Sequence, residues 1–490
     1  MELHQRIVSA PVDFGAIRSE FGLASAYPAE ATAEARDASD AFAGFRIDRT
    51  DVELVTIDPP GAMDLDQAVH LERTASGFTV HYAIADVAAV IDPDGALARE
   101  SESRGQTFYL PDGTVPLHPP VLSEGSASLL PEQTRPAVLW TIECDAAGEP
   151  AAYTVERALV RSRARLDYAG VQADAEAGRL HPSIAALPEF GQRRIEAGLA
   201  RGAIGLRLPL QSIVHAGGTD GHWQLVLEPR TAADDWNEQI SLLTGMVAAR
   251  IMLRGNESGE VIALLRTMPP PAESAIAAMR RTAAALGVDW PAGQPVGQML
   301  ALLDPNTPAA LVLMSEATGL LRGAGYTVLD GESGDRPDSL EHSAIGAPYA
   351  HVTAPLRRLG DRFATEICLA RCAGAEVPAW VRERMADVVT SLRRSDALAG
   401  KVERACIDLT EATLLSERVG SDFEAVVVRE ANGNRAAEIF VADPPVLGPC
   451  NGAPPEGGRV RVRLISADPT SRKIAFTYPA EPSGTAQTAN

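Results

Sequence analysis

The sequence has few cysteines and no long apolar run. Its five cysteines are scattered without CxxC spacing, so they indicate neither a disulfide framework nor a zinc ribbon. No apolar run approaches the roughly 20 residues that cross a bilayer, and residues 1–15 lack the apolar core of a signal peptide. We therefore expect a cytoplasmic globular protein without a membrane segment.

Lysine is also scarce, because only Lys401 and Lys473 occur among 44 basic residues and all the others are arginines. The planar guanidinium of arginine can bind a phosphate through two N–H groups. The net charge of −21 argues only weakly against a polyanionic partner, since nucleic-acid binding depends on a local basic surface. Coding bias can also produce an arginine excess, so composition leaves nucleic acid open as a partner.

The chain divides into regions of different pattern. Residues 1–45 contain two short helical patterns and predict a short helical N-terminal module. Residues 46–415 show strand patterns up to about residue 175 and helical patterns afterwards, which predicts a large mixed domain of the α+β class. Residues 416–480 alternate like a small antiparallel barrel, with an Asn-Gly turn at Asn432 and Gly433. Residues 481–490 are predicted to be a disordered tail.

Residues 56–72, TIDPPGAMDLDQAVHLE, contain three carboxylates within nine positions. Asp58, Asp64 and Asp66 are predicted to lie on a loop between two strands, with a Pro-Pro-Gly turn bending the chain so that they converge. A hard cation such as Mg²⁺ takes a few carboxylates and keeps water and substrate phosphate as its other ligands. Asp, Pro and Gly are also the usual residues of a solvated turn, so the loop alone leaves both interpretations open.

With this acidic loop, mixed domain and small barrel in order, the chain resembles the ribonuclease II family of processive exoribonucleases. Five segments of residues 46–415 carry the resemblance: TIDPPGAMDLDQAV, AIADVAAVI, RGQTFYLPDGTVPLHPPVLSEGSASLLP, LEPRTAADDWNEQISLLTGMVAARIM and YAHVTAPLRRLGDR. The resemblance implies a catalytic domain at 46–415 and an OB-fold RNA-binding domain at 416–480.

The resemblance also implies roles for single residues. Asp58, Asp64, Asp66 and Gln67 would form the Mg²⁺ site, with Mn²⁺ as a substitute, and Asp64, Asp66 and Arg357 would be catalytic. Tyr109 would orient the 3′-terminal nucleotide, with Glu238 and Glu403 in the same pocket and Arg358 as a further RNA contact. Taken singly, these positions also fit a core tyrosine, a surface ion pair and a solvated helix start.

The sequence departs from the family pattern in three places. The family's loop ends in two adjacent aspartates, whereas the second position here is Gln67, whose amide carries no charge. The aromatic residue that would sandwich the terminal base against the tyrosine falls near Leu206. Forty-five residues before the catalytic domain are too few for the family's two cold-shock domains, which suggests easier entry of structured RNA.

The resulting expectation is a monomeric, processive 3′-to-5′ exoribonuclease that hydrolyses RNA to nucleoside 5′-monophosphates. Its partners would be single-stranded RNA 3′ ends and structured RNA with a 3′ overhang, and its ribose contacts would favour RNA over DNA. One alternative is an RNA-binding relative whose catalysis is impaired by Gln67. Another is an unrelated phosphatase with a nucleophilic aspartate in the Asp-x-Asp of MDLDQAV, although this leaves the Arg357 segment and the barrel unexplained.

Overall fold

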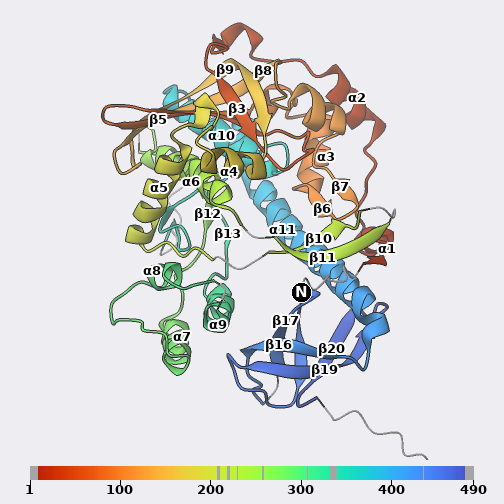
Figure 1. The fold of residues 1–490 in the computed structure, drawn as a ribbon. Coiled ribbons are helices and arrows are strands. Elements are labelled where there is room, and N and C mark those ends of the chain that lie inside the picture. Colours follow the sequence, from red (N-terminus) through yellow and green to blue (C-terminus); the bar gives the residue numbers. More distant parts are fainter. Residues whose placement is uncertain are drawn as a thin grey trace, which may run out of the picture.

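The computed structural model describes residues 9–206, 210–217, 221–228, 230–256, 259–305, 307–331, 339–433 and 435–480. The predicted tail at residues 481–490 lies outside these ranges. A strand-rich body lies at the top of Figure 1, a small barrel lies at the bottom, and one long helix connects them. The fold confirms the α+β class with a strand-rich part, a helical part and a terminal barrel.

The central sheet forms because β-branched and aromatic residues alternate along its long strands. Its six strands have the order β2-β9-β3-β4-β5-β8, and β9 also pairs with β8. The strands are β2 (Ile47–Asp48), β3 (Leu54–Ile57), β4 (Gln67–Arg73), β5 (Gly77–Ala85), β8 (Thr134–Asp145) and β9 (Pro150–Leu166). The fully buried side chains of Val80, Tyr82 and Trp140 from this sheet belong to the largest apolar core. The acidic segment lies between β3 and β4, at one edge of this core.

Helices pack against the sheet, form a separate cluster beside it, or run toward the barrel (Figure 1). They are α3 (Ala96–Arg104), α4 (Tyr168–Glu176), α5 (Leu187–Arg201), α6 (Ala232–Arg254), α7 (Glu273–Ala285), α8 (Val296–Ala301), α9 (Pro308–Thr318), α10 (Leu359–Cys372) and α11 (Ala379–Leu415). Helix α6 begins with a capping box in which Thr231 and Asp234 satisfy each other's backbone N–H groups. Helix α10 is buried along most of its length, so the residues just before it have a rigid support.

The second part of the large domain is less purely helical than the sequence predicts. It contains the hairpin β10 (Leu210–His215) and β11 (His222–Glu228), and the pairs β12 (Ile262–Thr267) with β13 (Gly325–Asp330) and β14 (Glu341–His342) with β15 (Ala347–Pro348). Short apolar runs such as IALLRT fit a buried strand and a buried helix equally well, which explains the difference. The strand-rich first part also contains the hairpin β6 (Phe108–Leu110) and β7 (Gly113–Val115).

The C-terminal region is a closed five-stranded barrel of order β16-β17-β18-β20-β19, which is OB-like. Its strands are β16 (Asp422–Arg429), β17 (Ala437–Ala442), β18 (Pro445–Asn451), β19 (Arg459–Asp468) and β20 (Lys473–Thr477). A bridge between Asn432 and Arg435 closes the turn predicted at Asn432 and Gly433. Alternating Val460, Val462 and Leu464 fill the interior, so the outward positions of β19 are left for polar residues.

The N-terminal segment packs against the large domain instead of standing apart from it. It contains β1 (Ala10–Pro11), α1 (Gly15–Glu20) and α2 (Ala29–Asp37), and β1 adds a strand to β11. Phe14 and Ile17 are fully buried in a cluster with Trp223 and Val402. Single turns of other helix types are η1 (Ala43–Phe45), η2 (Val87–Ala89), the π-helical η3 (Leu122–Ser126), η4 (Pro182–Ile184) and η5 (Ser416–Arg418).

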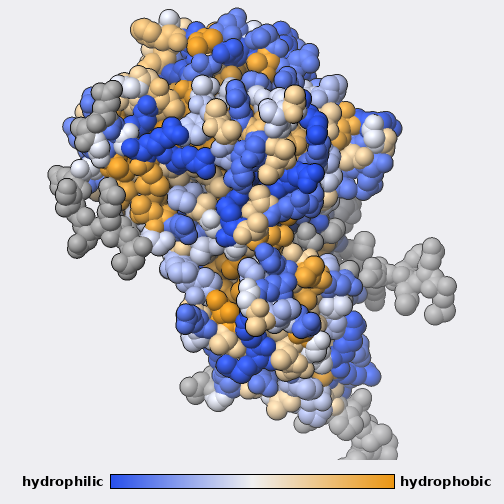
Figure 2. All heavy atoms as spheres, turned by 90° about the vertical axis from the view of Figure 1, so that its left-hand side faces the viewer, coloured by the Kyte–Doolittle hydropathy of each residue, from blue (hydrophilic) through white to orange (hydrophobic). Residues whose placement is uncertain are grey.

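The surface in Figure 2 is mostly hydrophilic, with small apolar patches, and the broad upper body narrows toward the lower part of the molecule. No helix in the described ranges has an apolar stretch that could cross a bilayer.

Candidate active site

The acidic loop, residues 58–66, is held in shape by a buried serine. The Ser128 hydroxyl accepts a hydrogen bond from Leu65 N at 3.0 Å and donates one to Met63 O at 2.6 Å. The Leu129 amide donates to Leu65 O at 3.0 Å. The backbone on both sides of Asp64 is therefore fixed by a segment more than 60 residues away.

Residues 353–358, here called the arginine loop, meet the acidic loop across 290 positions of sequence. Asp66 is 2% exposed, and its Oδ1 accepts a hydrogen bond from Leu356 N at 2.7 Å. The Arg357 Nε lies 3.7 Å from Asp66 Oδ2, while the Arg357 side chain remains 42% exposed. The buried carboxylate thus faces a guanidinium that solvent, and any ligand, can still reach.

Two further side chains shape the arginine loop. Asp361, which is fully buried, accepts a hydrogen bond from Ala354 N at 2.7 Å and another from Arg358 Nη2 at 2.8 Å. Gln67 Nε2 donates to Thr353 O at 2.5 Å. Sequence reasoning missed both Asp361 and Ser128. Asp361 had a signal, since it lies three positions after Arg358 at the start of a helix, but Ser128 had none.

A cavity of about 350 Å³ brings together most of the residues predicted to bind the nucleotide. Its lining consists of Gln106, Thr107, Phe108, Tyr109, Arg357, Arg358, Ala399, Val402 and Glu403. Tyr109 is 52% exposed, and its hydroxyl opposes the effect of burial on the pKa of the Asp64 carboxyl. Tyr109 is therefore a solvent-facing ring beside the acidic loop and not a core aromatic. Glu403 reaches the same cavity from α11.

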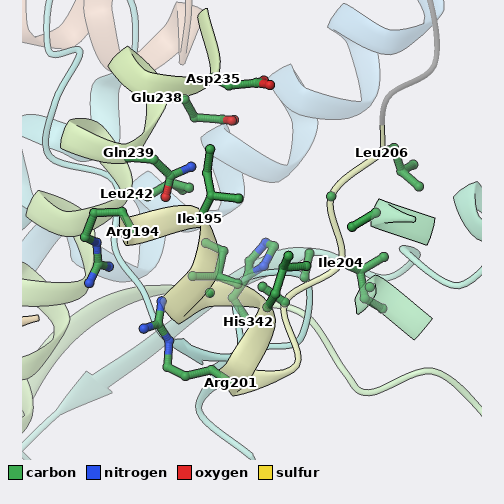
Figure 3. Close-up of a pocket in the computed structure, with 18 of the residues that line it drawn as sticks. Arg194, Ile195, Arg201, Ile204, Leu206, Asp235, Glu238, Gln239, Leu242 and His342 are labelled. Atoms are coloured by element: carbon green, nitrogen blue, oxygen red, sulfur yellow. The ribbon is translucent and has the colours of Figure 1, made fainter. Parts of the chain in front are cut away.

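Glu238 lies elsewhere, in a second cavity of about 490 Å³ between α5 and α6 (Figure 3). Glu238 pairs there with Arg230 at 2.5 Å, and Leu206 lines the same cavity. Figure 3 shows Asp235 and Glu238 at one end, and Arg194 and Arg201 at a distance from them. Glu238 projects from α6 and Glu403 from α11, and the two side chains line different cavities. A joint role of Glu238 and Glu403 in binding RNA stays a prediction.

The acidic side chains carry an electrostatic strain that a cation would relieve. Burial raises the pKa of Asp58 to about 6, and the neighbouring Asp64 carboxylate contributes to the rise. Burial also raises the pKa of Asp64, and it raises the pKa of Asp66 well above its usual range against the opposing effect of Arg357. A bound divalent cation would favour the ionised form of all three acids.

One buried atom fits a metal ligand in particular. Asp58 Oδ2 is buried and has no hydrogen-bond partner, which is costly for a carboxylate unless something else binds it. Across the described residues, however, no three His, Cys, Asp or Glu side chains lie close enough to hold one ion by themselves. An ion here would therefore take part of its coordination from water or from a substrate phosphate, as Mg²⁺ commonly does.

Comparisons with known proteins agree with this geometry. The RNB domain family matches residues 46–368, and the RNase II-type exonuclease C-terminal S1 domain matches residues 421–478. Ribonuclease R of Chlamydia trachomatis is 26% identical over 434 residues, which cover 85% of this chain and 59% of that protein. The chain spans about half the length of the curated relatives it matches.

Solved structures show the same fold. RNase R of Mycoplasma genitalium in complex with ribose-methylated single-stranded RNA superposes with a TM-score of 0.82 at 18% identity, covering 95% of this chain and 77% of that one. The same protein in complex with double-stranded RNA gives a TM-score of 0.80 at 19% identity, covering 95% and 82%. The family match at residues 46–368 extends over more than half of the sequence, and the chain therefore belongs to the RNB-domain, or ribonuclease II, family.

Proposed function

We propose that this protein is a 3′-to-5′ exoribonuclease that hydrolyses RNA to nucleoside 5′-monophosphates with Mg²⁺, or with Mn²⁺ in its place. The observation that carries the proposal is the meeting of Asp66 and Arg357 beside a cavity that contains Tyr109. Membership of the RNB-domain family supports it. Asp58, Asp64 and Asp66 would supply the carboxylate ligands of a metal, and water and substrate phosphate would complete its coordination. When bound, the metal would supply an activated water and neutralise charge on the phosphate.

The arginine contributes a fixed positive charge at the reacting phosphate. Arg357 is partly exposed, and its loop is anchored through Leu356, so its guanidinium can donate two N–H groups to a phosphate without first having to be ordered. Removing a fixed electrostatic donor of this kind typically costs about 10²- to 10³-fold in rate. Arg358 also lines the cavity, but Asp361 holds its guanidinium, so its main effect is on the shape of the loop.

The terminal nucleotide would be held by an aromatic ring and an acid. The half-exposed ring of Tyr109 offers a surface on which any base can stack, which explains activity without base preference. Glu403 in the same cavity can accept a hydrogen bond from a ribose hydroxyl, which would favour RNA over DNA.

A time course on a 5′-labelled single-stranded oligoribonucleotide with Mg²⁺ or Mn²⁺ tests the proposal. We expect labelled fragments that shorten stepwise from the 3′ end and nucleoside 5′-monophosphates as product. Retention of intact RNA without shortening would instead identify an RNA-binding relative. Hydrolysis of small phosphomonoesters alone would identify a phosphatase.

We further propose that RNA with a double-stranded part and a 3′ overhang is a substrate, in line with the relative's structure in complex with double-stranded RNA. Digestion of such a duplex should continue into the paired region. A stop in the single-stranded overhang, at a fixed distance from the duplex, would contradict this extension.

A further inference from the structure

Gln67 joins the two loops that carry the acids and the arginine. It is the first residue of β4 and follows Asp66 directly, and its Nε2 donates to Thr353 O at 2.5 Å across 286 positions of sequence. A backbone carbonyl only accepts hydrogen bonds, so the amide nitrogen, and not the amide oxygen, must face it. The orientation of this side chain is thus fixed by chemistry.

The arginine loop is held at almost every residue by an atom outside the loop. Thr353 O accepts a hydrogen bond from Gln67. Ala354 N donates one to Asp361, and Leu356 N donates one to Asp66. Further bonds are donated by His118 Nε2 to Pro355 O at 3.3 Å, by Thr107 N to Arg357 O at 3.0 Å, and by Arg358 Nη2 to Asp361 at 2.8 Å. Asp66 and Gln67, which are consecutive in the sequence, are therefore hydrogen-bonded to Leu356 and Thr353, near the two ends of the arginine loop.

We propose that Gln67 is a positioning residue, whose amide ties the acidic loop to the arginine loop and so fixes Arg357 relative to Asp66. This inference rests on the proposed nuclease function. An ionised aspartate or glutamate has no hydrogen to donate and would place a second acceptor against the Thr353 carbonyl. The uncharged residue at this position thus provides a connection that an ionised acid could not provide.

The connection can be measured without any enzymatic reaction. Gln67→Leu removes the donor at similar volume, and Gln298→Leu is a matched control, because Gln298 Nε2 also donates to a backbone carbonyl, that of Leu199, at 3.2 Å. In hydrogen–deuterium exchange of the protein without metal or RNA, the amides of Ala354, Leu356 and Arg357 should exchange about 2- to 10-fold faster in Gln67→Leu. The control should leave this segment unchanged. Unchanged exchange in Gln67→Leu would overturn the proposal.

A double-mutant cycle tests whether Gln67 acts through Arg357. Gln67→Leu should lower kcat about 10- to 100-fold with little change in the KM for RNA. In an Arg357→Ala background the same change should have almost no further effect. An equal loss of kcat in both backgrounds would contradict the positioning role.

Two measurements separate this role from direct metal binding. Mn²⁺ affinity, measured by electron paramagnetic resonance, should be the same in Gln67→Leu and in the unmodified protein, and clearly weaker binding would identify Gln67 as a ligand instead. Gln67→Glu should lose as much kcat as Gln67→Leu, and a kcat above that of the unmodified protein would overturn the proposal. If the unmodified protein cleaves no RNA, the nuclease function fails, while the exchange result still tests the connection.

Discussion

The candidate active site and the C-terminal barrel differ in how far their charged side chains are exposed to solvent. In the candidate active site, Asp66 and Asp361 are buried, and each lies close to an arginine and accepts a hydrogen bond from a backbone N–H. On the barrel, Arg459 and Arg461 point outward from β19 between buried valines. Buried, fixed charges suit bond cleavage, because they need no reorganisation as charge develops. Exposed arginines suit a polyanion held without regard to sequence, because they displace its counterions.

The largest effect should come from the buried charge. Asp66→Asn keeps an oxygen that can accept the Leu356 N–H but removes the charge, so kcat should fall by about 10³-fold or more while RNA affinity is retained. Gel-based kinetics and fluorescence anisotropy measure the two quantities. Asp51→Asn, at an exposed aspartate, is the control. Full activity in Asp66→Asn would remove this residue from the catalytic set.

Tyr109 combines features of both regions, since its side chain is exposed like the barrel arginines but lines the candidate active-site cavity. Tyr109→Ala should raise the KM for RNA by about 5- to 150-fold, which corresponds to the loss of about 1 to 3 kcal/mol of stacking. Tyr109→Phe keeps the ring and should retain most of the affinity, losing only the interaction of the hydroxyl with Asp64. Equal KM values for the alanine and phenylalanine variants would show that the hydroxyl, and not the ring, matters.

The junction between the two regions contains a buried acid without an arginine partner among its main contacts. Glu411 of α11 is 5% exposed, accepts a hydrogen bond from Gln211 Nε2 at 2.7 Å, and has its pKa raised to about 7 by burial. The folded protein therefore binds this proton more tightly than the unfolded chain does. The free energy of unfolding should then fall as pH rises from about 4.5 to about 7, by about 3 kcal/mol from this residue.

Urea unfolding at several pH values between 5 and 8 measures this contribution. Glu411→Gln is neutral throughout and should lack this part of the pH dependence, whereas Glu417→Gln, at an exposed position, should keep it. The same pH dependence in Glu411→Gln as in the unmodified protein would assign the effect to another group.

The smallest effect is expected on the barrel surface. The Arg461 side chain is 67% exposed and lies 3.3 Å from Asp422, so its truncation should leave folding and kcat unchanged. RNA affinity should fall about twofold, and the slope of log K against log salt should decrease by about 0.7, the contribution of one phosphate contact on a single strand. A loss of kcat comparable to that of Asp66→Asn would erase the distinction between the two regions.

Much of the fold could be predicted from local sequence because its signals are local. Alternation along β19 and the Asn432-Gly433 turn indicated the barrel, and the acidic segment was correctly placed between two strands. The β10–β11 hairpin was missed because short apolar runs have no decisive period.

The sequence by itself determined the acidic loop, and its resemblance to the ribonuclease II family singled out Asp64, Asp66, Tyr109, Arg357 and Glu403 as candidate site residues in advance. Only the tertiary structure decided how they are joined. It placed Glu238 in a second cavity, turned Arg358 toward Asp361, and brought Gln67 to Thr353 across 286 positions. The physical reason is that hydrogen bonds between distant segments depend on how the sheet and helix α10 pack, and no local pattern encodes that packing.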